Sequence, residues 1–198
     1  MNIKAEKIVK DAATFVKKLF DNELPEGMYF HNLGHTNNVV ESVTEIGIIN
    51  GSLTTMEQTI VLLAAWFHDS GYCHTYIGHE DNSISIATNF LNEQRCDITL
   101  IVQVTACIAA TKVPQRPQNL LQKILCDADM AHLAKSNYID YANRLKQEWQ
   151  IHLKKHFSEK QWWDLNLELL TQHKYFTAYG KDVLEVEKLK NIERLLKP

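Results

Sequence analysis

The sequence predicts an all-α protein of about eight or nine helices with no convincing strand. Apolar residues recur along most of the chain with the three- and four-residue spacing of a helix face, as in the stretch 60–67. Polar pairs typical of helix starts precede such stretches, namely Thr54 with Glu57 three residues later and Ser158 with Gln161 three residues later. Long helical patterns without intervening strands are typical of helical domains rather than of βαβ folds or barrels.

Composition bounds the class of protein. The 198 residues, of which 45% are apolar and 23% charged, predict one ordinary globular domain over residues 1–198. A net charge of −3 argues against binding to a nucleic-acid backbone, so no nucleic-acid partner is expected. No apolar run reaches membrane-span length, and the first residues lack the apolar segment of a secretory signal. We therefore expect a cytoplasmic protein with no membrane partner and with free cysteines.

The expected helices follow one another with short loops. They cover residues 3–20, the second half of 28–51 with Gly51 as its end, 54–71, about 81–94, 98–111, 120–135, 159–173 and 182–197. Residues 135–198 are helical and more polar, and no strong chemical signal stands out there. Their tryptophans fit either a core or the surface of a homodimer.

His68 and Asp69 close the most apolar of these helices. With Gly71 as its stop, the helix is expected to carry this imidazole and carboxylate in its last turn. Both groups need partners if they are buried. A His-Asp dipeptide arises often by chance, so the other polar residues in apolar helices decide its meaning.

Two more pairs of polar residues lie in apolar surroundings. His31 and His35, four residues apart, lead an apolar helix and share a face if the helix already runs there. Asp127 and Asp129 lie in an apolar helix, where acids are unusual without a cation or a donor. The simpler alternatives are a structural histidine, a helix cap, or an acid paired with Lys or Arg.

Core packing could bring these residues together as two imidazoles and two carboxylates. The set comprises His35, His68, Asp69, and either Asp127 or Asp129. Such nitrogen and oxygen ligands suit Mn²⁺, Fe²⁺, Zn²⁺, Co²⁺ or Ni²⁺ and tolerate Mg²⁺. A divalent ion of this kind activates water and polarises a phosphoryl oxygen, which phosphoester hydrolysis needs.

The order His … His-Asp … Asp resembles that of the HD superfamily of metal-dependent phosphohydrolases. The matching segments are FHNLGHTNNVV, AAWFHDSGY, GHEDNSISIA and LCDADMAHL, which together span about residues 28–135. The first segment is also similar to the Tyr-His-Asn-x-x-His segment of cyclic-nucleotide phosphodiesterases, with Phe30 in place of Tyr. The chain looks most like small stand-alone bacterial HD proteins. The resemblance implies an HD-type helical fold with a helical extension over 136–198.

This resemblance assigns metal ligands residue by residue. It implies that His35, His68, Asp69 and Asp129 bind the ion. Asp129 is favoured because the last Asp of the family commonly follows Ala and precedes a short apolar stretch. Asp127 is the alternative ligand, or it hydrogen-bonds a histidine ligand.

The resemblance also implies roles in catalysis. His31 aligns with the histidine that protonates the leaving group in the phosphodiesterases, and the alternative is a hydrogen-bond donor that supports a ligand. Glu80 would activate or orient the attacking water. From their charge and position rather than from the resemblance, Lys112 would neutralise phosphate oxygens or be a solvated loop charge, and Arg116 fits a solvated loop charge better.

Some HD proteins carry extra histidines that bind a second metal ion, and His74 and His79 lie in the corresponding interval. We therefore expect one divalent ion, with His79 as a ligand for a second if there are two.

The expected function is hydrolysis of a small-molecule phosphoester, most simply a nucleotide or related metabolite, by a metal-activated water. The rivals are a di-iron oxygenase of the HD fold, which needs His74 or His79, and a non-catalytic regulatory module that binds metal and nucleotide.

Overall fold

The structure, a computed structural model, describes residues 3–49 and 53–196, and over these ranges it is helical without strands, which confirms the expected fold class. The expected helix end at Gly51 lies outside the described residues. Within them, the nine α-helices are α1 (Ile3–Glu23), α2 (Leu33–Ile49), α3 (Thr55–Phe67), α4 (His79–Glu93), α5 (Ile98–Ala110), α6 (Leu120–Asp129), α7 (Tyr138–His152), α8 (Glu159–Gln172) and α9 (Glu185–Leu196). Two short turns follow α3 and α6, η1 (Ser70–Cys73) and η2 (Met130–Ala134), and the π-helical turn η3 (Gly180–Leu184) precedes α9.

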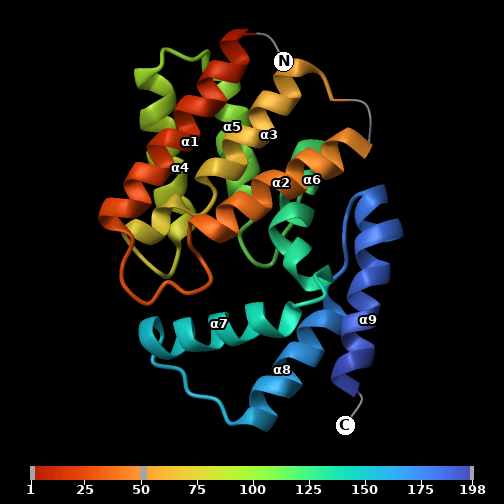
Figure 1. The fold of residues 1–198 in the computed structure, drawn as a ribbon. Helices are drawn as coiled ribbons and strands as arrows, with labels where there is room; N and C mark the ends of the chain where they lie inside the picture. Colours follow the sequence, from red (N-terminus) through yellow and green to blue (C-terminus); the bar gives the residue numbers. More distant parts are fainter. Residues whose placement is uncertain (1–2, 50–52, 197–198) are drawn as a thin grey trace.

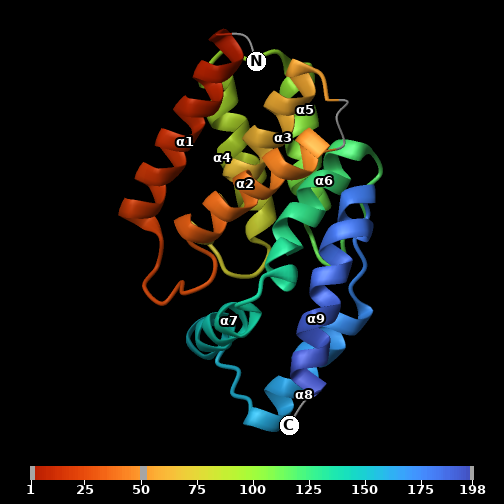
Figure 2. The same ribbon diagram turned by 45° about the vertical axis from the view of Figure 1, so that its right-hand side comes forward.

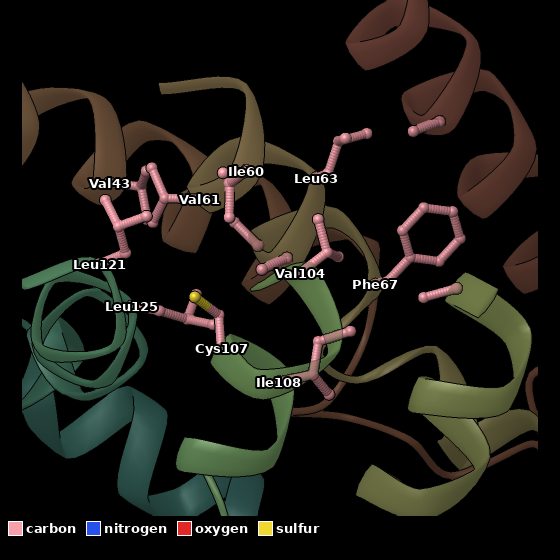
Figure 3. Close-up of a cluster of buried hydrophobic side chains, with 14 of the residues drawn as sticks. Val43, Ile60, Val61, Leu63, Phe67, Val104, Cys107, Ile108, Leu121 and Leu125 are labelled. Carbon is pink, nitrogen blue, oxygen red and sulfur yellow. The ribbon is translucent and has the colours of Figure 1, made fainter. Parts of the chain in front are cut away.

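Helices α1–α6 form a bundle, and α7–α9 gather at its lower end (Figures 1 and 2). Helix α3 lies at the centre of the bundle and packs against α1, α2, α5 and α6. Its side chains, among them Ile60, Leu63 and Phe67, are buried with Val104 and Leu125 from neighbouring helices (Figure 3). Burial of each such side chain stabilises the fold by about 1.5–3 kcal/mol. The end of α3 is therefore held firmly by the helices around it.

Both predicted capping boxes are present. The Thr54 hydroxyl accepts the N–H of Glu57 while the Glu57 side chain accepts the N–H of Thr54, and Ser158 with Gln161 repeats the arrangement at α8. The box satisfies donors that the first turn of a helix leaves free, so these starts were readable from the sequence.

Helix α3 ends at Phe67, earlier than the expected stop at Gly71. His68 and Asp69 therefore lie just past the helix rather than in its last turn. The Ser70 hydroxyl donates to the Phe67 carbonyl, and the chain turns through η1 onto the first turn of α4. A Cβ at Gly71 would lie 1.9 Å from the His79 carbonyl oxygen, so this turn can press against α4 only with glycine.

Helix α6 is also shorter than expected. It ends at Asp129 and continues as η2, so Asp127 and Asp129 occupy its last turn rather than its middle. The last carbonyl groups of a helix lack partners inside it, which makes such an end dependent on outside contacts.

Helices α7–α9 build a second, smaller core. It contains buried Tyr138, Trp162 and Leu170, with Trp149 packed against it, whereas Trp163 is exposed. Trp149 and Trp162 are thus explained by packing. A homodimer through this region stays a prediction.

No helix among the described residues is both long and apolar enough to cross a membrane. No disulfide joins the four cysteines, all of which lie among the described residues.

Replacing Gly71 with Ala should destabilise the protein by about 3 kcal/mol or more, because the new methyl group would overlap the backbone of α4. Gly78→Ala is the matched control: its Cβ meets open space, and only the positive φ of 73° costs about 1–2 kcal/mol. Urea denaturation of both variants measures the difference. Equal losses would show that the close approach at Gly71 is not needed.

Candidate metal centre

His35 of α2, His68 just past the end of α3 and Asp129 at the end of α6 meet in one place. One ligand atom from each lies within 4.8 Å of the others. The Nε2 atoms of the two histidines are 3.4 Å apart, and Asp129 Oδ1 lies 3.2 Å from that of His35 and 3.7 Å from that of His68. Such a group of side chains can hold a metal ion.

Asp69 completes the cluster from the turn after α3. Its Oδ2 atom lies 3.4 Å from Nε2 of His35 and 3.2 Å from Nε2 of His68. The structure thus brings together all four residues that the HD resemblance assigned as ligands. They are separated by up to 94 positions in the sequence and are joined by the packing of α2, α3 and α6.

Local hydrogen bonds fix His35 in the first turn of α2. The Asn32 side-chain oxygen accepts the N–H groups of Gly34 and His35, at 2.9 and 3.3 Å, and so caps the helix. The Asn32 amide in turn donates to the carbonyls of Met28 and Tyr29. The sequence FHN thus fixes the start of α2 and with it the position of His35.

The tautomer of His68 is set by the end of its own helix. Its Nδ1 donates to the Ala65 carbonyl at 2.8 Å, which leaves Nε2 as the nitrogen that faces His35. In a neutral imidazole this Nε2 carries a lone pair. A backbone partner on the second nitrogen is typical of histidines that bind metal ions.

Asp69 Oδ2 is buried and has no hydrogen-bond partner within the described ranges 3–49 and 53–196. Its contacts to the two imidazoles are within ion-pair distance but lack hydrogen-bond geometry. A buried carboxylate oxygen without a donor is costly, whereas a cation between it and the imidazole nitrogens would satisfy all three atoms. The residues present therefore fit a divalent metal ion.

Electrostatics in the cluster favour positive charge. Burial opposes protonation of His68, but the charges of Asp69 and Asp129 outweigh it and raise its pKa to about 9. Burial likewise opposes ionisation of Asp69, yet the neighbouring histidines hold the pKa of its carboxyl well below the usual range. The carboxylates thus stabilise a cation placed among these side chains.

His79 and Tyr72 extend the cluster on the far side of Asp69. The Nε2 of His79 lies 3.3 Å from Asp69 Oδ1, and its ring stacks on Tyr72 with centroids 3.8 Å apart. Glu80 is mostly buried beside His79, with its Oε2 atom 3.7 Å from Nδ1. His74 is exposed in the preceding turn. Of the two candidate second-metal histidines, the structure brings only His79 to the cluster.

His31 lies next to the cluster and is held by Glu148 of α7. The ring centroids of His31 and His35 are 5.8 Å apart, and Nδ1 of His31 donates to Glu148 Oε1. The other Glu148 oxygen accepts the N–H groups of Phe30 and His31, at 2.7 and 3.0 Å, and Tyr76 donates its hydroxyl to Oε1. Glu148 is 0% exposed, so its charge depends on these four donors.

These bonds have two consequences for His31. Burial opposes its protonation, but the hydrogen bond and charge of Glu148, with Asp69 and Asp129, outweigh burial and raise its pKa. Because Nδ1 is engaged, Nε2 is the nitrogen left to exchange a proton with a ligand.

Glu148 was missed in the sequence, because the last third of the chain showed no strong chemical signal. Tyr138, Tyr141, Leu145, Glu148 and His152 share one face of α7 at helical spacing. The available signal was a carboxylate on that otherwise apolar and aromatic face, but no residue near it in the sequence identified its partner.

His132 was missed as well. It follows Asp129 by three residues, and its Nδ1 donates to the Asp129 carbonyl at 3.0 Å. Its ring packs edge-on against Phe30 with centroids 5.0 Å apart. Burial, with the nearby His35, lowers its pKa to about 4, so it is neutral near pH 7.

Lys112 lies at the surface and pairs with a residue outside the four-residue cluster. Its Nζ donates to Asp81 at 2.6 Å, and the pair joins the loop after α5 to the first turn of α4. Arg116 is exposed. From this loop it is Gln115 that reaches the cluster, with its amide 3.4 Å from Asp129 Oδ2.

The two acids of the triplet Asp127-Ala128-Asp129 face different partners. Asp129 joins the histidines, whereas the Asp127 carboxylate accepts the backbone N–H groups of Phe176 and Thr177, each at 2.8 Å. Asp127 therefore bonds to the C-terminal third instead of to a histidine.

Comparison of the chain with protein-family models, with curated proteins and with solved structures found no match.

Replacing Glu148 with Ala should lower the free energy of unfolding by about 3–5 kcal/mol, because His31 and two backbone N–H groups lose a buried charged partner. Tyr76→Phe removes one hydroxyl from the same carboxylate and should cost about 1 kcal/mol. Chemical denaturation compares the two variants. A loss for Glu148→Ala no larger than that for Tyr76→Phe would contradict this account of α7.

Proposed function

We propose that this protein is a metal-dependent phosphohydrolase of the HD type, acting on a small phosphoester such as a nucleotide or related metabolite. The observation that carries the proposal is the buried, unpartnered Oδ2 of Asp69 facing the Nε2 atoms of His35 and His68. Asp129 adds a second carboxylate. The order of these residues in the sequence supports the HD type.

His35, His68, Asp69 and Asp129 would hold the ion. Two imidazoles and two carboxylates suit Mn²⁺, Fe²⁺, Zn²⁺, Co²⁺ or Ni²⁺ and tolerate Mg²⁺. When bound, such an ion supplies water of lowered pKa and neutralises charge on a phosphoryl oxygen. Helices α2, α3 and α6 hold the four side chains before any substrate arrives, so little reorganisation is needed on binding.

His31 would give the proton that the leaving oxygen needs. Glu148 fixes its Nδ1, so the ring is oriented and the proton would leave from Nε2. Tyr72 stacks on the ring with centroids 4.4 Å apart and restricts its rotation. Glu148 does not reach the reacting atoms in this proposal and acts by orienting His31.

Glu80 and Lys112 keep the roles expected from the sequence. Glu80, beside His79, would orient water near Asp69. Lys112 would neutralise phosphate oxygens, for which its ammonium has to exchange Asp81 for the substrate. Gln115, which already contacts Asp129, is a further donor available to a phosphate from the same loop.

Turnover of a panel of nucleotides, cyclic nucleotides and sugar phosphates, with each divalent ion in turn, tests the proposal. We expect metal-dependent release of phosphate or nucleoside by the wild type, and a loss of at least about 10³-fold in Asp69→Asn, because an amide replaces a charged ligand. His74→Ala, an exposed histidine in the next turn, is the control and should keep full activity. No turnover by a wild-type protein that holds metal would contradict the hydrolase and leave the oxygenase or the regulatory module.

A di-iron oxygenase is the second candidate, and the contact between His79 Nε2 and Asp69 Oδ1 favours it. With each of its two oxygens near imidazole nitrogens, Asp69 has the placement of a carboxylate shared by two ions.

Iron content per chain separates the two candidates. The oxygenase requires about two irons in the wild type and about one in His79→Ala, with a visible absorption band that the variant loses. The hydrolase with a single ion predicts about one iron per chain in the wild type and in His79→Ala. That result would exclude the di-iron oxygenase.

A further inference from the structure

The segment 127–136, which carries Asp129 and His132, is fastened to the C-terminal third of the chain. Side chains from residues 175–194 donate to a series of its backbone carbonyls. The bonds are Tyr175 hydroxyl to Met130 at 3.1 Å, the Asn191 amide to Leu133 at 2.8 Å and Lys135 at 2.9 Å, and Arg194 to Ser136 at 3.1 Å.

The strongest attachment joins Asp127 to residues 175–180, which we call the strap. Oδ2 of Asp127 accepts both the N–H and the hydroxyl of Thr177, at 2.8 and 2.7 Å, and the hydroxyl in turn accepts the N–H of Gly180. Asp127 and Thr177 are 0% and 3% exposed. A Cβ at Gly180 would lie 2.4 Å from Asp127 Oδ2, so the strap can lie this close only with glycine there.

Asp129 lies between two of these attachments. Asp127 is held by Thr177 two residues before it, and the carbonyl of Met130 is held by Tyr175 immediately after it. Asp129 is also the last residue of α6, where the hydrogen bonds inside the helix run out. The strap therefore supplies one donor to a carbonyl at this helix end, the Tyr175 hydroxyl, and anchors the side chain of Asp127 beside it.

We propose that the strap positions the metal ligand Asp129, with Thr177 and Tyr175 as the positioning residues. The inference rests on the metal centre proposed above. Neither residue touches the four-residue cluster; each acts through the backbone that carries Asp129. Ligand sites tolerate displacements of only about 0.5 Å, so loss of one attachment changes how well the ion is held.

Cobalt binding tests this role without any substrate. Co²⁺ is titrated into metal-free protein, and its dissociation constant and visible ligand-field spectrum are measured. Tyr175→Phe and Thr177→Val each remove one hydroxyl and should weaken Co²⁺ binding about tenfold and alter the spectrum. Thr177→Ser, which keeps the hydroxyl, should have the Co²⁺ affinity and the spectrum of the wild type.

Thr171→Val is the matched control, because Thr171 is an exposed residue of α8 whose hydroxyl donates only within its own helix. It should bind Co²⁺ as the wild type does. If Thr177→Val does not fold, Tyr175→Phe decides, since it retains the buried ring.

Variants that lose thermal stability but keep the wild-type affinity and spectrum would overturn the proposal and make the strap a purely structural contact. Failure of the metal centre itself looks different. In that case the wild type would not bind Co²⁺, or Asp129→Ala would bind it as tightly as the wild type does, and the positioning role would fall with it.

Discussion

The structure depends on one electrostatic constraint: the carboxylate of Asp69 is buried among imidazoles, and one of its oxygens has no hydrogen-bond donor. An isolated buried charge is too costly to persist, so its surroundings have to supply positive charge. His68, whose pKa the neighbouring carboxylates raise to about 9, does so in part, and a divalent ion would complete it. The apolar packing of α3 thus keeps the negative charge of Asp69 buried, and the proposed metal ion would neutralise that charge.

The bundle and the C-terminal third contribute to this site in different ways. Helices α2 and α6 and the turn that follows α3 carry the four candidate ligands, and the packing of these helices sets the distances among them. The C-terminal third reaches the site indirectly, through Glu148 of α7 on His31 and through Thr177 of the strap, between α8 and α9, on Asp127. Both contacts are buried carboxylates that accept several donors, a type of contact that is costly to break and geometrically specific. The C-terminal third is therefore better understood as support for the site than as a separate unit.

The fold class and the helix starts could be predicted because their signals are local, as in the box of Thr54 and Glu57. The four clustered side chains could be proposed because polar residues in apolar helices and the HD-like order both pointed to them. The ends of α3 and α6 were misplaced, since contacts with α4 and the strap determine where they stop. Glu148 and His132 were missed because their roles depend on partners that only the tertiary structure identifies, Glu148 being 117 residues from His31.

The most direct test of the central claim is a crystal structure of the manganese-loaded protein with anomalous scattering data. The account predicts a single strong anomalous peak within bonding distance of His35 Nε2, His68 Nε2, Asp129 and Oδ2 of Asp69, or this peak and a second one beside His79. The absence of an anomalous peak among these side chains would contradict it, whether or not manganese is bound elsewhere in the crystal.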